Sequence, residues 1–266
     1  GAVGTESSPL EPRAEGRGAY SRGKFQAEAL VRAAVAEQQL HAVIVRPGHI
    51  WTEEGPLLSP AVGMRVGRWL VMLGGGSWED NETIHSQAIS AITDESPIAF
   101  IPAANPDPLG GEVFLAFYAE LGAPHGYIVP IHDQQSANDP ANYRRLANAS
   151  LIYIGNGSIQ RLLEAVEGTS TIDAIVAAFD GGAVIVGESA GAMLMGKWGV
   201  GPEAGKIYPG WGWVSDALVA PHHTPERILA VRTALQRYPE AIALGLPDGV
   251  ALALGPEGEL ATWTDT

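Results

Sequence analysis

Residues 183–198, AVIVGESAGAMLMGKW, hold the pattern that decides the fold of this chain. The run 183–186 is apolar and rich in β-branched side chains, which is typical of a central strand in a parallel sheet. Residues 187–191 then fit G-x-S-x-G, in which flanking glycines relieve crowding where a strand turns sharply into a helix. Good helix formers follow, so we expect a helix from Ala192 to Trp198.

The serine at this corner, Ser189, is the candidate nucleophile. A strand-turn-helix corner exposes its hydroxyl, and the N–H of Ala190 at a helix N-terminus can face a developing oxyanion. The alternative is a turn of small residues that only allows the helix and the strand to pack closely. A five-position pattern with three fixed residues often occurs by chance, so the motif alone is weak evidence for a catalytic serine.

The composition limits the classes of protein to which the chain can belong. With 266 residues and 46% hydrophobic content it can bury a sizeable core, and no apolar run approaches the roughly eighteen residues of a membrane span. The net charge of -14 argues against nucleic acid and anionic membranes as partners. The absence of cysteine excludes disulfides, thiolate metal sites and a cysteine nucleophile. We see no secretory signal and expect a cytoplasmic protein.

Residues 1–66 differ in charge from the remainder of the chain. They are neutral by formal charge, so the whole excess of acidic residues falls on 67–266. We therefore predict an N-terminal appendage over 1–66 and a larger domain over 67–266, with the boundary anywhere between 58 and 68. Apolar spacing in the appendage predicts one helix up to about Gln39, and the run 42–45 predicts one strand.

The appendage carries the motif Tyr20-x-x-x-Lys24, followed by a helix, a strand and VRPGHIW. Over about residues 18–75 this resembles the extended short-chain dehydrogenases, in which the tyrosine is the acid/base and the lysine holds the nicotinamide ribose. No Gly-rich dinucleotide loop precedes Tyr20 here. We therefore expect the appendage to bind no NAD(P). Its apolar helix face should pack on the larger domain or on a second subunit, which would make a homodimer.

Strands and helices alternate through the larger domain. We expect strands at 69–73, 97–102, 126–130, 150–154, 183–186 and 217–220, and helices at 81–93, 110–121, 140–148, 158–167, 171–179 and 225–237. This alternation predicts an α/β fold with a mostly parallel sheet and helices on both faces.

Two further segments reach the carboxyl edge of the expected sheet, where open α/β sheets bind ligands. In the loop 155–160, GNGSIQ, a glycine N–H could be a second oxyanion donor, with Gly157 as first choice and Gly155 in reserve. A plain turn that needs positive φ explains either glycine equally well. At Pro221-His222-His223 one of the two histidines is placed to act as a base. A metal site there is the poorer interpretation, because no nearby acid completes a ligand set.

The order of motifs from 67 to 266 resembles the dipeptidase E and cyanophycinase family of serine peptidases. The motifs that carry the resemblance are LGGG at 73–76, ASLIYIGNGSIQ at 149–160, GESAGAM at 187–193, GWGWV at 210–214, PHHTPER at 221–227 and ALGLPDGVALAL at 243–254. The resemblance implies a class I glutaminase-like three-layer sandwich and a Ser-His-acid triad. A glutaminase itself is excluded, because its nucleophile is a cysteine.

Carried over by position, the resemblance makes Ser189 the nucleophile, His222 the base, and Gly157 with Ala190 the oxyanion hole. The family's acid lies in the loop after the serine, where Glu203 is the nearest carboxylate, so we name Glu203. Glu188 and Asp216 are the other candidates for this acid.

The resemblance implies hydrolysis of amide bonds in small peptides, either as an exopeptidase or on the aspartate-arginine polymer cyanophycin. The loop GNGSIQ departs from the family's form, so the sequence does not choose between these substrates. We expect no cofactor and no metal. The rival hypothesis is a catalytically inactive binding or scaffold domain, which the lack of an acid in the expected window favours.

Overall fold

The computed structural model describes residues 32–33, 68–105, 107–202, 206–256 and 258–265. By its internal contacts the chain divides into two units, Gly1–Glu53 and Glu54–Thr266. Of the first unit only Arg32 and Ala33 are described, and both are helical and exposed. The expected appendage, with Tyr20, Lys24 and its domain boundary, therefore lies outside the described residues. The account below concerns residues 68–265.

The main sheet has seven strands in the order β11-β10-β1-β5-β4-β2-β3. Five neighbouring strands, from the middle of the sheet to one edge, run parallel: β1 (Leu70–Leu73), β5 (Val184–Glu188), β4 (Leu151–Ile154), β2 (Ile98–Ile101) and β3 (Gly126–Ile128). At the other edge β10 (Val250–Leu254) and β11 (Leu260–Thr264) run antiparallel. The apolar β1, β2, β4 and β5 are buried along their whole length, as expected for strands covered on both faces.

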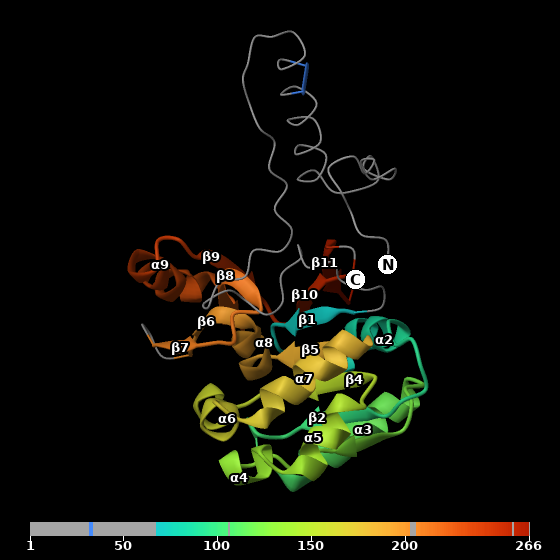
Figure 1. Ribbon diagram of the computed structural model, residues 1–266. Helices are drawn as coiled ribbons and strands as arrows, with labels where there is room; N and C mark the ends of the chain where they lie inside the picture. The colour runs from blue at the N-terminus through green and yellow to red at the C-terminus, as the bar shows by residue number, and fades with distance from the viewer. Residues whose placement is uncertain (1–31, 34–67, 106, 203–205, 257, 266) are drawn as a thin grey trace. The chain divides into compact units, whose positions relative to one another are not determined.

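Alternate residues of these strands pack against helices on opposite faces. One face packs its strand residues, such as Val71 and Val186, against α2 (Glu82–Ser90) and α3 (Pro108–Glu120). The other face, with Met72 and Ile185, packs against α5 (Pro140–Ala147), α6 (Ile159–Val166), α7 (Ser170–Gly181) and α8 (Ala190–Met195). Figure 1 shows the resulting helix-sheet-helix layers. The expected α/β fold with helices on both faces is confirmed.

Local sequence signals explain where several helices begin. Asp107 and Asp139 each precede a proline at the first helical position, and each carboxylate accepts a hydrogen bond from a backbone N–H of the first turn of α3 or α5. The hydroxyl of Ser158 caps α6 by accepting from the backbone N–H of Arg161. The short α4 (Gln134–Ala137) begins with a capping box at Asp133.

A second, four-stranded sheet extends the domain beyond α8. Its order is β7-β6-β8-β9, formed by β6 (Gly196–Val200), β7 (Ile207–Pro209), β8 (Val214–Pro221) and β9 (Ile242–Leu246). The helix α9 (Ile228–Arg237) packs Val231 and Ala234 against Leu218 and Ala220 of β8. The prediction that the helix after Ser189 continues to Trp198 is wrong. It ends at Met195, because Gly196 and Gly199 are poor helix formers and residues 196–200 pair with β7 and β8.

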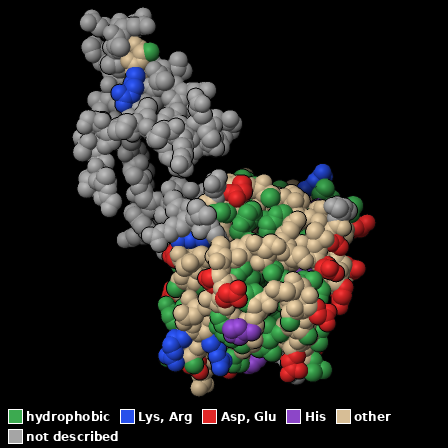
Figure 2. Space-filling model, turned by 90° about the vertical axis from the view of Figure 1, so that its right-hand side faces the viewer, with side chains coloured by type: hydrophobic (Ala, Val, Ile, Leu, Met, Phe, Trp, Pro, Cys, Tyr) green, Lys and Arg blue, Asp and Glu red, His purple; other side chains and the backbone are tan. Residues whose placement is uncertain are grey.

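The surface of the domain mixes charge types. On the face in Figure 2, acidic side chains are scattered among apolar and polar ones, and Lys and Arg occupy only a few places. Within the described residues, no helix combines the length and the apolar character that crossing a bilayer requires.

Candidate active site

The candidate site is built around the sharp turn at Ser189, between the end of β5 and the start of α8. Ser189 has φ 51° and ψ -100°, a backbone conformation that side-chain-bearing residues rarely adopt. The N–H of Ser189 donates to the carbonyl of Leu73, which ties the turn to β1. Gly191 allows α8 to start so close to β4, because a Cβ there would collide with the carbonyl oxygen of Ile154. The predicted strand-turn-helix corner is therefore present.

His222 lies directly after β8, and its imidazole meets Ser189. The distance from Ser189 Oγ to His222 Nε2 is 2.8 Å, a normal hydrogen bond. His222 also has positive φ, at 49°, and its N–H donates to the carbonyl of Gly74. In the described part of the chain only Ser189, Asp216 and His222 combine a side chain with positive φ. Such strain is held where the surrounding structure demands it, and it gathers at functional sites.

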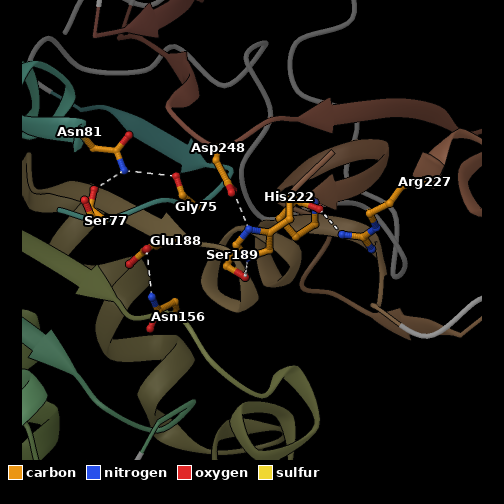
Figure 3. Close-up of polar contacts among 10 residues, drawn as sticks. Gly75, Ser77, Asn81, Asn156, Glu188, Ser189, His222, Arg227 and Asp248 are labelled. Atoms are coloured by element: carbon orange, nitrogen blue, oxygen red, sulfur yellow. Dashed lines mark hydrogen bonds and ion pairs between the residues drawn. The ribbon is translucent and has the colours of Figure 1, made fainter. Parts of the chain in front are cut away.

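The acid hydrogen-bonded to His222 is Asp248, in the turn from β9 to β10. Its Oδ1 lies 2.6 Å from His222 Nδ1, so Ser189, His222 and Asp248 form one chain of hydrogen bonds (Figure 3). The sequence analysis did not consider Asp248. It lies in the quoted stretch 243–254, where a Pro-Asp-Gly turn between two apolar runs was the available signal. Nothing in its spacing connects it with Ser189.

Two of the three carboxylates considered from the sequence, Asp216 and Glu188, have other surroundings. Glu203 lies outside the described residues. Asp216 forms an exposed ion pair with Lys197, with 3.1 Å between Oδ1 and Nζ. Glu188 is fully buried and faces away from the imidazole nitrogens, toward other donors described below. Of the carboxylates in the described ranges, Asp248 is the one that contacts His222.

The glycine-rich turn 74–76 lies behind the pair of His222 and Asp248. The carbonyl of Gly74 accepts from His222, and that of Gly75 accepts from the N–H of Gly249, next to Asp248, at 3.1 Å. A Cβ on Gly75 would lie 2.5 Å from His222 Nδ1 and 2.7 Å from Asp248 Oδ1, which no real side chain tolerates. The turn LGGG therefore has a structural role that the sequence did not reveal: its bare backbone makes room for the imidazole and the carboxylate.

The buried Asn81 holds this turn in place. Its Nδ2 donates to the carbonyls of Gly75 and Ser77, at 3.2 and 2.8 Å (Figure 3). Asn81 has no exposed surface, and it is the last residue of the short 3-10 helix Glu79–Asn81. Asn81 thus supports, through Gly75, the backbone under His222.

The site is open on the side of the base and closed on the side of the serine. The side chains of His222 and Asp248 are 46% and 59% exposed, whereas Ser189 is buried at 6%. Water therefore screens the charge of Asp248, and its role toward His222 is mainly one of orientation.

Glu188, the residue before Ser189, is a buried carboxylate with three donors. Its Oε2 accepts from Tyr153 Oη at 2.8 Å and from Trp78 Nε1 at 3.3 Å, and its Oε1 accepts from Asn156 Nδ2 at 3.1 Å. Burial raises the pKa of Glu188, and these hydrogen bonds, together with the nearby His222, act in the opposite direction. Burial, and then the charge of Glu188, raise the pKa of Tyr153 well above its usual value.

The two expected oxyanion donors both border the Ser189 turn. Ala190 is the first residue of α8, and the first N–H groups of a helix have no acceptor within it. The loop after β4 lies beside the turn because Ile154 pairs with Gly187. In that loop the N–H of Gly155 donates to the carbonyl of Ile101, whereas Gly157, with φ 133°, donates to no backbone acceptor among the described residues. This favours Gly157 over Gly155 as a free donor.

His223 and the alternative of a metal site are the remaining features predicted from the sequence. His223, adjacent to the base, packs its ring against Gly245 of β9. The hydroxyl of Ser189 is hydrogen-bonded to His222 and not to His223. Within the described ranges, no group of three or more His, Asp or Glu side chains is arranged to hold a metal ion.

Comparisons with known proteins point to one family. Residues 70–259 match the family described as Peptidase family S51. Among solved structures, a peptidase from an acI-B1 Actinobacterium superposes with a TM-score of 0.59 and 19% identity, covering 76% of this chain and 96% of the other. A protein described as a peptidase E from Listeria monocytogenes EGD-e gives 0.53 and 17%, covering 74% and 98%. At these identities the two structures support the fold alone. None of the curated proteins matches the sequence.

Proposed function

Because the chain belongs to peptidase family S51, we propose that it is a serine hydrolase that cleaves amide bonds in small peptides through an acyl-enzyme. The observation that carries the proposal is the chain of hydrogen bonds from Ser189 Oγ through His222 to Asp248 Oδ1. We assign Ser189 as nucleophile, His222 as general base and Asp248 as the acid that orients it. The last assignment replaces the expectation for Glu203.

The geometry supports a definite sequence of proton movements. With the Nδ1 proton of His222 donated to Asp248, the unprotonated Nε2 faces the Ser189 hydroxyl and accepts its proton as Oγ attacks the peptide carbonyl carbon. The same proton then passes from Nε2 to the departing amine as the C–N bond breaks. A water molecule, deprotonated by His222, attacks the ester, and Ser189 regains its proton as the acid product leaves.

The N–H groups of Ala190 and Gly157 are the proposed donors to the oxyanion of both tetrahedral intermediates. They would stabilise negative charge that exists only while the carbonyl carbon is tetrahedral, which is how such donors accelerate acyl transfer. Ala190 has the further advantage of the positive end of the α8 dipole.

Small peptides are the proposed substrate class. The family resemblance implies peptides with an acidic residue at the scissile bond, or the aspartate-arginine polymer, and the site itself leaves this choice open. The rival hypothesis of an inactive scaffold depended on the lack of an acid for His222. Asp248 removes that reason.

A fluorophosphonate probe tests the proposal directly, because it reacts with an activated serine and not with ordinary hydroxyls. We expect stoichiometric labelling of the wild type at Ser189, and none in Ser189→Ala. A panel of dipeptides and tripeptides, with and without acidic residues, should then show turnover that the same substitution abolishes. Wild-type protein that is folded but neither labelled nor active on any of these peptides would refute the proposal and restore the scaffold hypothesis.

A further inference from the structure

Glu188 is placed so that its side chain cannot take part in the proton transfers, although it adjoins Ser189 in sequence. Side chains alternate along β5, so Glu188 faces the α2/α3 layer with Val184 and Val186. There it is surrounded by Trp78, Tyr153 and other aromatic rings. Burying a carboxylate in such a layer is costly unless donors compensate it. The burial of the Glu188 carboxylate therefore needs an explanation.

The three donors to Glu188 come from three separate segments that border the Ser189 turn. Trp78 lies between β1 and the 3-10 helix, Tyr153 lies within β4, and Asn156 lies in the loop from β4 to α6. Asn156 belongs to an exposed loop, yet its amide is turned inward to the carboxylate (Figure 3). One buried carboxylate thus joins the turn, the sheet and the loop.

The contact with Asn156 has a consequence for the loop that carries Gly157. Backbone hydrogen bonds hold the ends of this loop, from Gly155 to Ile101 and from Ser158 to Ala104. Between these ends, the bond from Asn156 Nδ2 to Glu188 Oε1 is the one that ties the loop to the Ser189 turn in the described part of the chain.

We propose that Glu188 is a positioning residue of this site, which holds Asn156 and thereby sets where the Gly157 N–H lies relative to Ser189 Oγ. The inference rests on the proposed function. A donor displaced by an ångström loses much of its stabilisation of the oxyanion but little of its contact with the ground-state substrate. The effect should therefore appear in kcat and leave KM nearly unchanged.

The Asn156→Asp substitution tests this with almost no change in shape. It removes the amide donor and sets a second carboxylate against Glu188, so we expect kcat to fall about 10- to 100-fold, with KM within about threefold of wild type. Asn148→Ala is the matched control, because Asn148 is also an exposed asparagine whose Nδ2 donates, to the carbonyl of Arg144 in α5. We expect it to leave kcat unchanged.

The double variant Glu188→Gln/Asn156→Asp exchanges donor and acceptor. The new amide at 188 donates to the new carboxylate at 156, and its oxygen still accepts from Tyr153 and Trp78. We expect kcat to recover to within about threefold of wild type, whereas Asn156→Asp alone stays low. A purely structural role for Glu188 would not produce this recovery.

Two outcomes would overturn the inference: wild-type kcat in Asn156→Asp, or a double variant no better than Asn156→Asp. The rate of fluorophosphonate labelling should follow kcat through the series. Failure of the proposed function is separately visible, because the wild type would then show neither labelling nor turnover, or Ser189→Ala would retain them. If Asn156→Asp is unstable, Asn156→Ala, which introduces no charge, should show the same loss of kcat with unchanged KM, and wild-type kcat in it would also overturn the inference.

Discussion

Replacing Gly75 with alanine would place a methyl group between His222 and Asp248. Its Cβ would lie 2.5 Å from His222 Nδ1, whereas ordinary van der Waals contact begins at 3.4 Å. The ring carbon Cε1 would be closer still, at 2.1 Å, so the imidazole must move by about 1.3 Å, and a displacement of about 1 Å already costs about 100-fold in rate. The hydrogen bond of 2.8 Å from Ser189 Oγ to Nε2 weakens once the atoms separate beyond about 3.2 Å. We expect Gly75→Ala to lower kcat/KM at least 100-fold.

The same substitution also strains the backbone, so a control must separate strain from the clash. Gly75 has φ +141°, where a side chain costs about 1–2 kcal/mol. Gly122, after α3, has φ +84° and nothing within 4 Å of its added Cβ. We expect Gly122→Ala to lose similar stability in urea unfolding but to keep wild-type activity.

The assay is the rate of fluorophosphonate labelling and peptide turnover at a temperature where circular dichroism shows all three proteins folded. Labelling of Gly75→Ala within about threefold of the wild-type rate would refute the reasoning, because it would mean that His222 adapts to the added methyl without losing Ser189.

Three further predictions follow from the same structure. Asp248→Asn should lower kcat about 100-fold or more, because the amide that replaces the carboxylate can donate to His222 Nδ1 and hold the imidazole in the wrong tautomer, whereas Glu203→Gln should not; the reverse result would return the role to Glu203. Burial lowers the pKa of His85 to about 4 from 6.5, so the unfolded chain binds more protons between these values and stability falls as pH drops from about 6.5 toward 4. Urea unfolding at about pH 7.5 and pH 5 should therefore show about 2 kcal/mol more loss in the wild type than in His85→Gln, and equal losses would contradict it. Arg227 donates to the carbonyl of the residue before His222 and to two carbonyls at the end of β6, those of Val200 and Gly201. Arg227→Met should therefore cost about 1–3 kcal/mol of stability and lower kcat, and an unchanged Tm in calorimetry would contradict this.

Local patterns in the sequence were sufficient for the five parallel strands of the main sheet and for the turn at Ser189, but not for the antiparallel β10 and β11. Apolar β-branched runs, Asp-Pro helix starts and the G-x-S-x-G corner depend on residues within a few positions of each other, so they can be recognised in a window. This is why the strands around β5 and the corner at Ser189 were predicted where they occur. Local signals also indicated a histidine base between a strand and a helix start, but they left His222 and His223 open, and the family resemblance selected His222.

The second sheet and the acid at His222 depend on contacts far apart in the chain. The segment 196–200, GKWGV, follows the good helix formers of α8 directly, and its pairing with β7 and β8 makes it a strand. Asp248 reaches His222 because β8 pairs with β9 in parallel and the chain then turns into β10 of the main sheet. A search for an acid near the serine in sequence could not find it.

The sequence by itself determined the alternation of strands and helices, the sharp corner at Ser189 and a histidine base at 222 or 223, because each follows from the chemistry of neighbouring residues. The tertiary structure alone decided that Asp248 is the acid at His222 and that Gly75 must lack a side chain. It also decided that Glu188 contacts Asn156 and not the imidazole nitrogens. These choices depend on how two sheets meet at one edge, and that meeting is determined by the packing of the whole domain.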